Sequence, residues 1–299
     1  MADCKSIIIL SEKSSGSSAC QDLLEEFANA RHVAKTRHFE NETLYWTKAA
    51  SILGRPQRKM VDSEVPIATE KARSDLIALL RENLDEYQPP SDDEKLIMEG
   101  WRQLCRKHVP IFLEKSPHHL CQWSAIELIL EAADKLEDID FLLIGLIRNP
   151  LDTIHSHYRR WKSPCADVEK QWRAAYGNLL RLRDETGARL VIVRYEDMVS
   201  SIECMRPVFE FCEVELLSSM GNKLHRNSVN TSQNTPGFGF VLSEETRQLA
   251  EEYGYTREET ANEPHLLWPL VSRSSRWVHL ALKFALGIRD RLSPAQDSE

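Results

Sequence analysis

The sequence contains no C-x-x-C pair, although seven cysteines are spread along its 299 residues. Cysteines at that spacing are common ligands of structural zinc and common markers of a redox motif, so neither kind of site is indicated. An odd number of scattered cysteines does not suit a disulfide framework either. We therefore expect reduced thiols, as in a cytoplasmic protein. The positions are Cys4, Cys20, Cys105, Cys121, Cys165, Cys204 and Cys212.

Long apolar runs and an excess of positive charge are also missing. The first apolar run, Ile7–Leu10, is too short for a signal peptide or a membrane span, so we expect a soluble protein with no integral membrane segment. The net charge is −8, which disfavours nucleic-acid binding through a broad basic surface. Any polyanion would need a local positive cleft. Hydrophobic residues at 42% and charged residues at 28% fit a globular protein.

A loop of small residues links the first apolar strand to the first helical pattern. Ile7–Leu10 is followed by Lys13-Ser14-Ser15-Gly16-Ser17-Ser18, and helical spacing begins at Gln21. This order points several backbone N–H groups at one place, which suits a phosphate or sulfate. The lysine precedes the glycine, whereas a nucleoside-triphosphate loop has it after the last glycine. An ordinary serine-rich turn is the alternative interpretation.

Strands and helices alternate along the chain, which predicts an α/β fold with a parallel sheet flanked by helices. Residues 32–39 have an extended pattern, and Asn41 can cap a helix from Glu42 to Ile52. We expect a single domain over residues 1–299, with a helical segment at about 55–108 that shapes an acceptor site and an amphipathic helical tail at about 270–299. Further strands are expected at 109–113, 141–147 and 189–193, and further helices at 124–136 and 168–186.

Two basic residues follow strands of the expected sheet. Lys115 comes shortly after the second strand, and Arg148 directly after the third. Ligands of parallel sheets bind at the carboxyl ends of the strands, so both side chains should lie near the serine loop. A guanidinium suits a phosphate, and Ser156 is placed where the next helix could present a hydroxyl to the same group.

Together these segments resemble the sulfotransferases that use 3′-phosphoadenosine 5′-phosphosulfate, and the carbohydrate-type members in particular. The serine loop looks like their 5′-phosphosulfate loop, and Arg148-Asn149-Pro150-Leu151-Asp152 with Ser156 looks like their 3′-phosphate motif. Glu114-Lys115-Ser116-Pro117 recurs in carbohydrate-type members, and Val193–Asp197 matches a structural segment of the family. The motifs occur in the family's order over about residues 6–215.

The resemblance implies a P-loop-like three-layer fold and transfer of a sulfuryl group to a hydroxyl of a carbohydrate or glycolipid, without a metal. Lys13 would stabilise the leaving oxygen. The residues that would contact the nucleotide co-substrate are Lys13, Ser14, Ser15, Gly16, Ser17, Ser18, Lys115, Arg148 and Ser156.

Three residues are candidates for the base that takes the acceptor proton. His38, Glu40 and Glu42 alternate at a spacing of two, so an extended chain would place them on one face. Carbohydrate-type members place a glutamate just before two aromatic residues, and Glu42 before Tyr45-Trp46 fits that spacing best. His38 corresponds to the histidine of other members. A glutamate that merely favours the start of a helix is the alternative for Glu42.

Two other functions remain open at this point. A small-molecule kinase of related fold would need the lysine after the glycine and a magnesium-binding aspartate after a strand, and neither pattern is evident. A non-catalytic module could keep the nucleotide pocket, but Lys13 together with a candidate base favours an enzyme. His118 and His119 follow the second strand and are further candidates for the acceptor cleft. The acceptor itself and the oligomeric state are not indicated.

Overall fold

The computed structural model describes residues 4–185, 190–225 and 228–266, together with residues 268, 272 and 277. It divides into two compact units. The first comprises residues 1–148 and 171–227, and the second comprises residues 149–170 and 228–299. The single domain expected from the sequence stays a prediction. Apart from residues 272 and 277, the expected tail helix at 270–299 lies outside the described residues.

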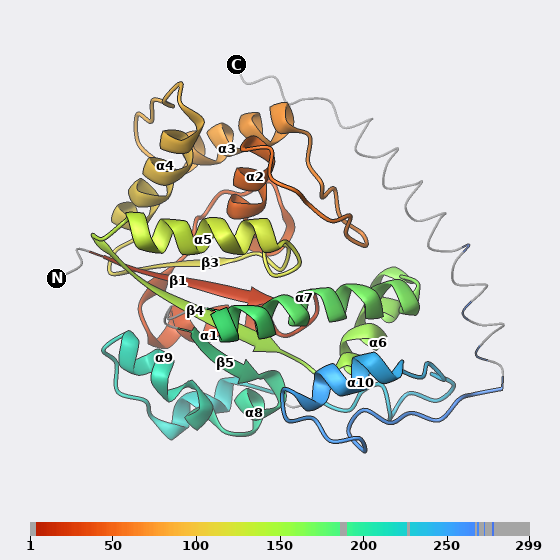
Figure 1. Cartoon of the computed structure of the whole chain (residues 1–299). Helices are drawn as coiled ribbons and strands as arrows, with labels where there is room; N and C mark the ends of the chain where they lie inside the picture. Colours follow the sequence, from red (N-terminus) through yellow and green to blue (C-terminus); the bar gives the residue numbers. More distant parts are fainter. Residues whose placement is uncertain are drawn as a thin grey trace. The chain divides into compact units, whose positions relative to one another are not determined.

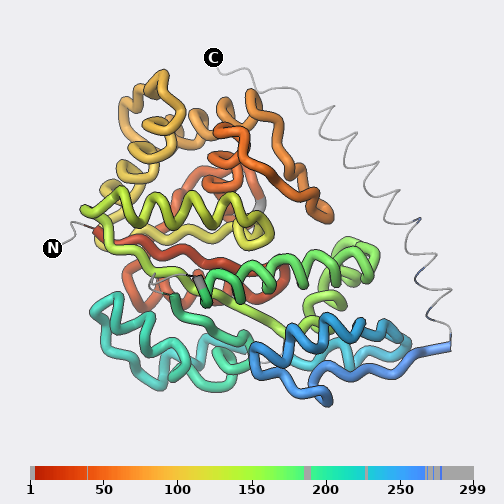
Figure 2. Tube along the Cα trace, viewed as in Figure 1, coloured from red at the N-terminus to blue at the C-terminus, as the bar shows by residue number. Residues whose placement is uncertain are grey.

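A parallel sheet forms the centre of the first unit, as predicted, and it has five strands (Figure 1). The strand order is β2-β3-β1-β4-β5. β1, red in Figure 2, lies between β3 and β4, and its apolar residues Ile7–Leu10 are fully buried. A strand covered on both faces needs such a continuous apolar run. The bounds are β1 (Cys4–Ser11), β2 (Ala30–Arg31), β3 (Ile111–Lys115), β4 (Ile139–Ile147) and β5 (Leu190–Arg194).

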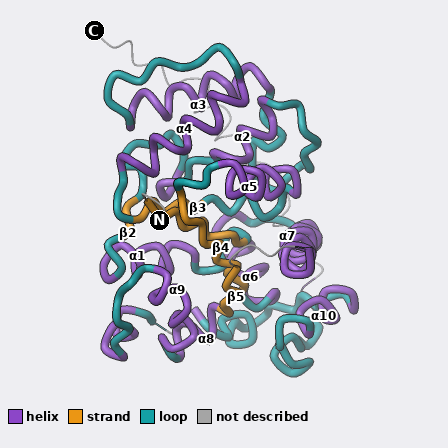
Figure 3. Tube along the Cα trace, turned by 60° about the vertical axis from the view of Figure 1, so that its left-hand side comes forward, coloured by secondary structure: helices purple, strands orange, loops and turns teal. Residues whose placement is uncertain are grey.

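Helices cover both faces of this sheet. Figures 1 and 3 show α5 and the later part of α7 on one face, and α1 and α9 on the other. Gly145 of β4 allows α7 to approach closely, because a Cβ atom there would lie 2.6 Å from Leu179. The helices are α1 (Ser17–Phe27), α2 (Tyr45–Ile52), α3 (Thr69–Asn83), α4 (Asp93–Lys107), α5 (Trp123–Lys135), α7 (Cys165–Glu185, in this unit from Gln171), α8 (Tyr195–Ser200) and α9 (Arg206–Phe211), with 3₁₀ turns η1 (Phe39–Asn41), η2 (Ile202–Met205) and η3 (Ser218–Lys223).

The segment at 55–108 is helical, as expected, and contributes α3 and α4. Asp92 caps α4 by accepting a 2.7 Å hydrogen bond from the backbone N–H of Lys95. Trp101 of α4 packs on Phe112 of β3, with 5.0 Å between ring centroids. This aromatic contact fixes the segment beside the sheet. Its part in acceptor binding stays a prediction.

The segment between β2 and α2 was predicted wrongly. Residues 32–39 do not continue as a strand, and the next helix begins at Tyr45 rather than Glu42. Glu40, Asn41 and Leu44 have positive φ angles of 55°, 59° and 51°, so the chain turns here instead of extending. β3 also lies two residues later than predicted, which makes Lys115 its last residue. The candidate bases therefore lie on an irregular turn.

The second unit contains α6 (Pro150–Trp161), the start of α7 and α10 (Glu244–Glu251). Asn149 caps α6 by accepting from the backbone N–H of Leu151. Asp152 accepts hydrogen bonds from the backbone N–H groups of Asn230 and Ser232, at 2.7 and 2.8 Å. The long polar connection before α10 is thus tied to α6, and the acidic residue of the sequence motif serves as its anchor.

Candidate active site

The loop after β1 has the geometry of an anion site. α1 begins at Ser17, so Ser17 and Ser18 belong to its first turn. No side chain caps this end, and no acidic residue lies in the first turn. The backbone N–H groups of an uncapped helix start attract an anion. Gly16 has a φ of 87°, and a Cβ atom on it would lie 2.2 Å from the ring of Tyr195, so the loop requires glycine.

Tyr176 of α7 supports this loop from behind, and sequence reasoning missed it. Its hydroxyl lies 2.8 Å from Ser15 Oγ, accepts from the backbone N–H of Glu12 at 3.3 Å and donates to the Leu146 carbonyl at 3.1 Å. It therefore ties the loop to β4. The sequence offered no signal beyond an aromatic residue at core spacing from Trp172.

Glu12 points away from the loop. Its carboxylate accepts from Gln171 Nε2 at 2.6 Å and from Cys121 Sγ at 3.0 Å, and the residue is fully buried. Burial raises the pKa of Glu12, while the bonds from Cys121 and Gln171 oppose the rise. An acidic residue next to the anion loop is thus compatible with anion binding, because its side chain belongs to the core.

Three loop side chains have separate environments. Lys13 Nζ donates to the Asp62 carbonyl at 2.8 Å. Ser14 Oγ is buried and, among the described residues, has no hydrogen-bond partner. A buried hydroxyl without a partner is costly unless a ligand satisfies it, so Ser14 fits an anion-binding loop. Ser18 Oγ donates to Glu40 Oε2 at 2.9 Å, which connects α1 to the turn that carries the candidate bases.

Arg148 lies beneath the loop at the end of β4. It is buried, its Nη1 donates to the Ser14 carbonyl at 2.7 Å, and its guanidinium lies 5.2 Å from the centroid of the Tyr195 ring. Tyr195 thereby contacts both Arg148 and Gly16. These contacts give the Val193–Asp197 motif a structural role. Ser156 is half-buried on α6 in the other unit. Its pairing with Arg148 on one phosphate stays a prediction.

Lys115 lies close to two of the candidate bases, Glu40 and Glu42. Its buried Nζ donates to the Glu40 carbonyl at 2.9 Å and lies 3.8 Å from Glu40 Oε2 and 3.9 Å from Glu42 Oε1. Burial raises the pKa of Glu42 from 4.5 to about 7, although Lys115 and Lys13 act against the rise. Glu42 is thus a half-buried carboxyl whose pKa matches that of a base working near neutral pH.

His38 does not lie with Glu40 and Glu42, although all three were expected on one face of an extended chain. Its Nε2 lies 3.7 Å from Glu64, and its ring lines a pocket with Lys48. Burial, assisted by the positive charge of Lys48, lowers the pKa of His38 to about 4. Glu40 and Glu42 are brought together with Lys115, and His38 is not.

The two histidines after β3 have different roles. His118 is buried, with Nδ1 3.5 Å from Glu42 Oε2. Burial and the charge of Lys13 lower the pKa of His118 well below its usual value, so its imidazole is neutral near pH 7. His119 is fully buried, with Nδ1 2.9 Å from Thr47 Oγ1 and Nε2 3.2 Å from Glu114 Oε2. His118 therefore joins the candidate site, whereas His119 belongs to the network beneath it.

The described part of the chain lacks both a metal-binding cluster and a membrane-spanning helix. Those residues contain no cluster of three or more histidine, cysteine, aspartate or glutamate side chains arranged to hold a metal ion. Within the same residues, no helix has the length and apolar character needed to cross a bilayer.

Comparison with known proteins adds a family and a fold. The family model "Sulfotransferase family" matches residues 6–218. Among solved structures, the sulfotransferase domain from the curacin biosynthetic pathway superposes with a TM-score of 0.54 at 14% identity, covering 86% of this chain and 99% of that one. The sulfotransferase domain from the Synechococcus PCC 7002 olefin synthase gives 0.53 at 20%, covering 85% and 96%.

No curated protein matches the sequence significantly. The structural neighbours support the P-loop-like α/β fold expected from the sequence. The family model covers well over half of the chain, including the anion loop, Glu42, Lys115 and Arg148. This protein therefore belongs to the sulfotransferase family.

Proposed function

We propose that this sulfotransferase uses 3′-phosphoadenosine 5′-phosphosulfate and that Glu42 is the base that takes the proton of the acceptor hydroxyl. The observation that carries the proposal is the position of Glu42. Its side chain is 14% exposed, has a pKa of about 7, and has Oε1 3.9 Å from Lys115 Nζ. The turn that carries it is hydrogen-bonded to the first turn of α1, from Ser18 Oγ to Glu40 Oε2.

The residues of the loop fit the donor. Three features of the loop suit a phosphosulfate group. They are the uncapped start of α1, the buried Ser14 hydroxyl, which has no hydrogen-bond partner among the described residues, and Gly16 with its φ of 87°. When bound, the donor supplies the sulfuryl group that passes to the acceptor oxygen. Arg148 and Ser156 are the residues proposed for the 3′-phosphate.

The protein's own contribution is positioning and electrostatics, as in phosphoryl transfer. Lys13 supplies positive charge for the departing oxygen. Lys115 keeps a fraction of Glu42 ionised against the effect of burial, because it is the main charge that lowers the pKa of that carboxyl. His118, neutral and 3.5 Å from Glu42, helps to shield the carboxylate from water.

The acceptor is proposed to be a hydroxyl of a carbohydrate or glycolipid. Support comes from the resemblance in sequence: Glu114-Lys115-Ser116-Pro117 recurs in carbohydrate-type members, and Glu42 precedes Tyr45-Trp46 at their spacing. Within the fold, Glu114 and Ser116 are buried, and Ser116 Oγ donates a 2.5 Å hydrogen bond to Glu114 Oε1. This motif therefore supports the architecture of the site more than the choice of acceptor.

Three variants assign the base. Glu42→Gln should lower the single-turnover rate of sulfuryl transfer by roughly 10²–10⁴, the usual contribution of a general base. Its affinity for adenosine 3′,5′-bisphosphate, measured by calorimetry, should change less than about threefold. Glu40→Gln and His38→Asn are the comparisons. Normal turnover in Glu42→Gln with loss in either comparison would transfer the role to that residue.

A further inference from the structure

The turn that carries Glu42 has an unusual backbone. Glu40 and Leu44, on either side of it, both have left-handed φ angles of 55° and 51°. Residues other than glycine and asparagine seldom adopt that region, and they keep it only where the surroundings determine it. The contacts that hold this turn therefore bear directly on where the Glu42 carboxylate lies.

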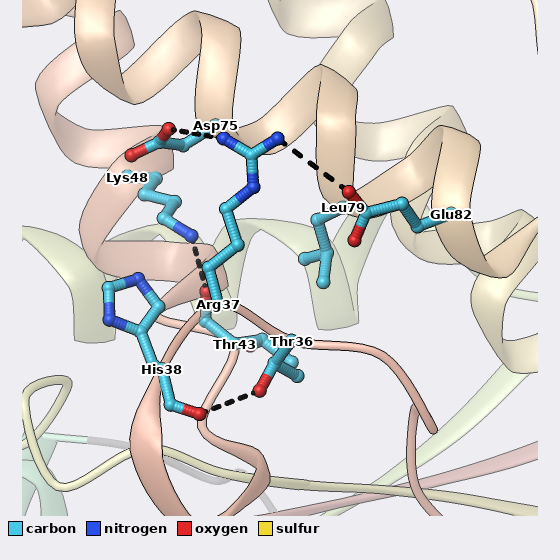
Figure 4. A pocket seen from close by; sticks show the side chains of 8 residues that line it. All are labelled: Thr36, Arg37, His38, Thr43, Lys48, Asp75, Leu79 and Glu82. Carbon is cyan, nitrogen blue, oxygen red and sulfur yellow. Dashed lines mark hydrogen bonds and ion pairs between the residues drawn. The ribbon is translucent and has the colours of Figure 1, made fainter. Parts of the chain in front are cut away.

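Those contacts converge on Thr43, the residue after Glu42. Its side-chain hydroxyl donates to Glu114 Oε1 at 2.7 Å and accepts from the backbone N–H of Tyr45 at 3.0 Å. Its carbonyl accepts from Lys48 Nζ at 2.8 Å, as the dashed line in Figure 4 shows. One residue thus anchors the turn through both its side chain and its main chain.

Glu114 and Ser116, at the end of β3, hold this turn in place. Ser116 Oγ accepts from the backbone N–H of Leu44 at 3.0 Å and donates to Glu114 Oε1 at 2.5 Å. Glu114 is fully buried, and its pKa is lowered because His119, Ser116 and Thr43 together outweigh the effect of burial. An ionised carboxylate that receives several hydrogen bonds is a rigid acceptor. Glu114 and Ser116 belong to the sequence motif Glu114-Lys115-Ser116-Pro117.

We propose that Thr43, Ser116 and Glu114 form a clamp that positions the Glu42 carboxylate for proton transfer. Thr43 and Ser116 are positioning residues, because they act through Glu42. The proposal rests on the proposed function, in which Glu42 is the base. A displacement of about 1 Å in a reacting group can lower a rate about 100-fold, so a clamp on the adjacent peptide is sufficient to control turnover.

A matched pair of variants tests the clamp. Thr43→Val keeps the side-chain shape and removes both hydroxyl bonds, whereas Thr43→Ser retains the hydroxyl. We expect Thr43→Val to lower kcat about 10–100-fold and Thr43→Ser to stay within about threefold of the parent. Affinity for adenosine 3′,5′-bisphosphate should change less than about threefold in both, because Thr43 makes no hydrogen bond to the anion loop.

A double variant that combines Glu42→Gln with Thr43→Val distinguishes a positioning role from a general structural defect. In a Glu42→Gln background, Thr43→Val should change the residual rate less than about twofold, because the carboxylate it positions is already gone. An undiminished kcat in Thr43→Val alone, or an equal loss in both backgrounds, would overturn the clamp. If Thr43→Val does not fold, Ser116→Ala gives the same test through the backbone N–H of Leu44. Normal turnover of Glu42→Gln by itself would refute the base assignment instead.

Discussion

The rate of sulfuryl transfer should rise with pH through the pKa of Glu42. A base must be ionised to accept a proton, and burial sets the pKa of this carboxyl at about 7. Near pH 6 about one tenth of the molecules would have Glu42 ionised, so the rate should be about tenfold below its plateau above pH 8. A carboxyl with an ordinary pKa would give a flat profile over this range.

Lys115→Met extends the test to the cause of that pKa. Lys115 is the largest influence that lowers it, so removing the charge should move the midpoint upward by about one pH unit or more. The measurement is the single-turnover release of adenosine 3′,5′-bisphosphate between pH 5.5 and 9. Lys135→Met, at an exposed lysine paired with Glu94, is the control and should leave the midpoint unchanged. A flat profile in the parent, or an unmoved midpoint in Lys115→Met, would refute the reasoning.

Three further predictions concern stability and nucleotide binding. The folded-state pKa of Glu42 is raised, so its contribution to stability is present below about pH 4.5 and is lost as pH rises through about 7. The free energy of unfolding of Glu42→Gln, measured in urea, should therefore exceed that of the parent by up to about 3 kcal/mol at pH 8 and equal it near pH 4.5. Gly16→Ala should cost about 2–4 kcal/mol from strain and overlap with Tyr195, against about 1–2 for Gly54→Ala, which has a φ of 64° and open space around it. Arg148→Ala should weaken calorimetric binding of adenosine 3′,5′-bisphosphate by about 2–3 kcal/mol and that of a nucleotide without the 3′-phosphate by less; equal losses would contradict its role at that phosphate.

Much of the fold followed from the sequence. The buried strand Ile7–Leu10, the small-residue loop and Arg148 after an apolar strand are local patterns, and parallel strands bring their carboxyl ends to one edge of the sheet. The turn around Glu42 did not follow. Its left-handed residues are held by hydrogen bonds that Thr43 and Leu44 donate to Glu114 and Ser116, which are distant in sequence. Lys48, which lies beyond the turn, donates a further bond to the Thr43 carbonyl. Local propensity favours a helix from Glu42, and tertiary contacts overrule it.

The interior of the site was the least predictable part. Tyr176 supports the anion loop, and Glu12 belongs to a buried hydrogen-bond network. Such roles depend on which side chains meet across the sheet, and residue spacing does not reveal that.

The most direct test of the account is the fate of label from two donors in parallel reactions. With ³⁵S in 3′-phosphoadenosine 5′-phosphosulfate and a panel of glycans, glycolipids and phenols, we expect label to move to an acceptor and adenosine 3′,5′-bisphosphate to form in equal amount. Label from γ-³²P ATP should stay on the nucleotide. Transfer of phosphoryl label, with the sulfate donor untouched, would contradict the account.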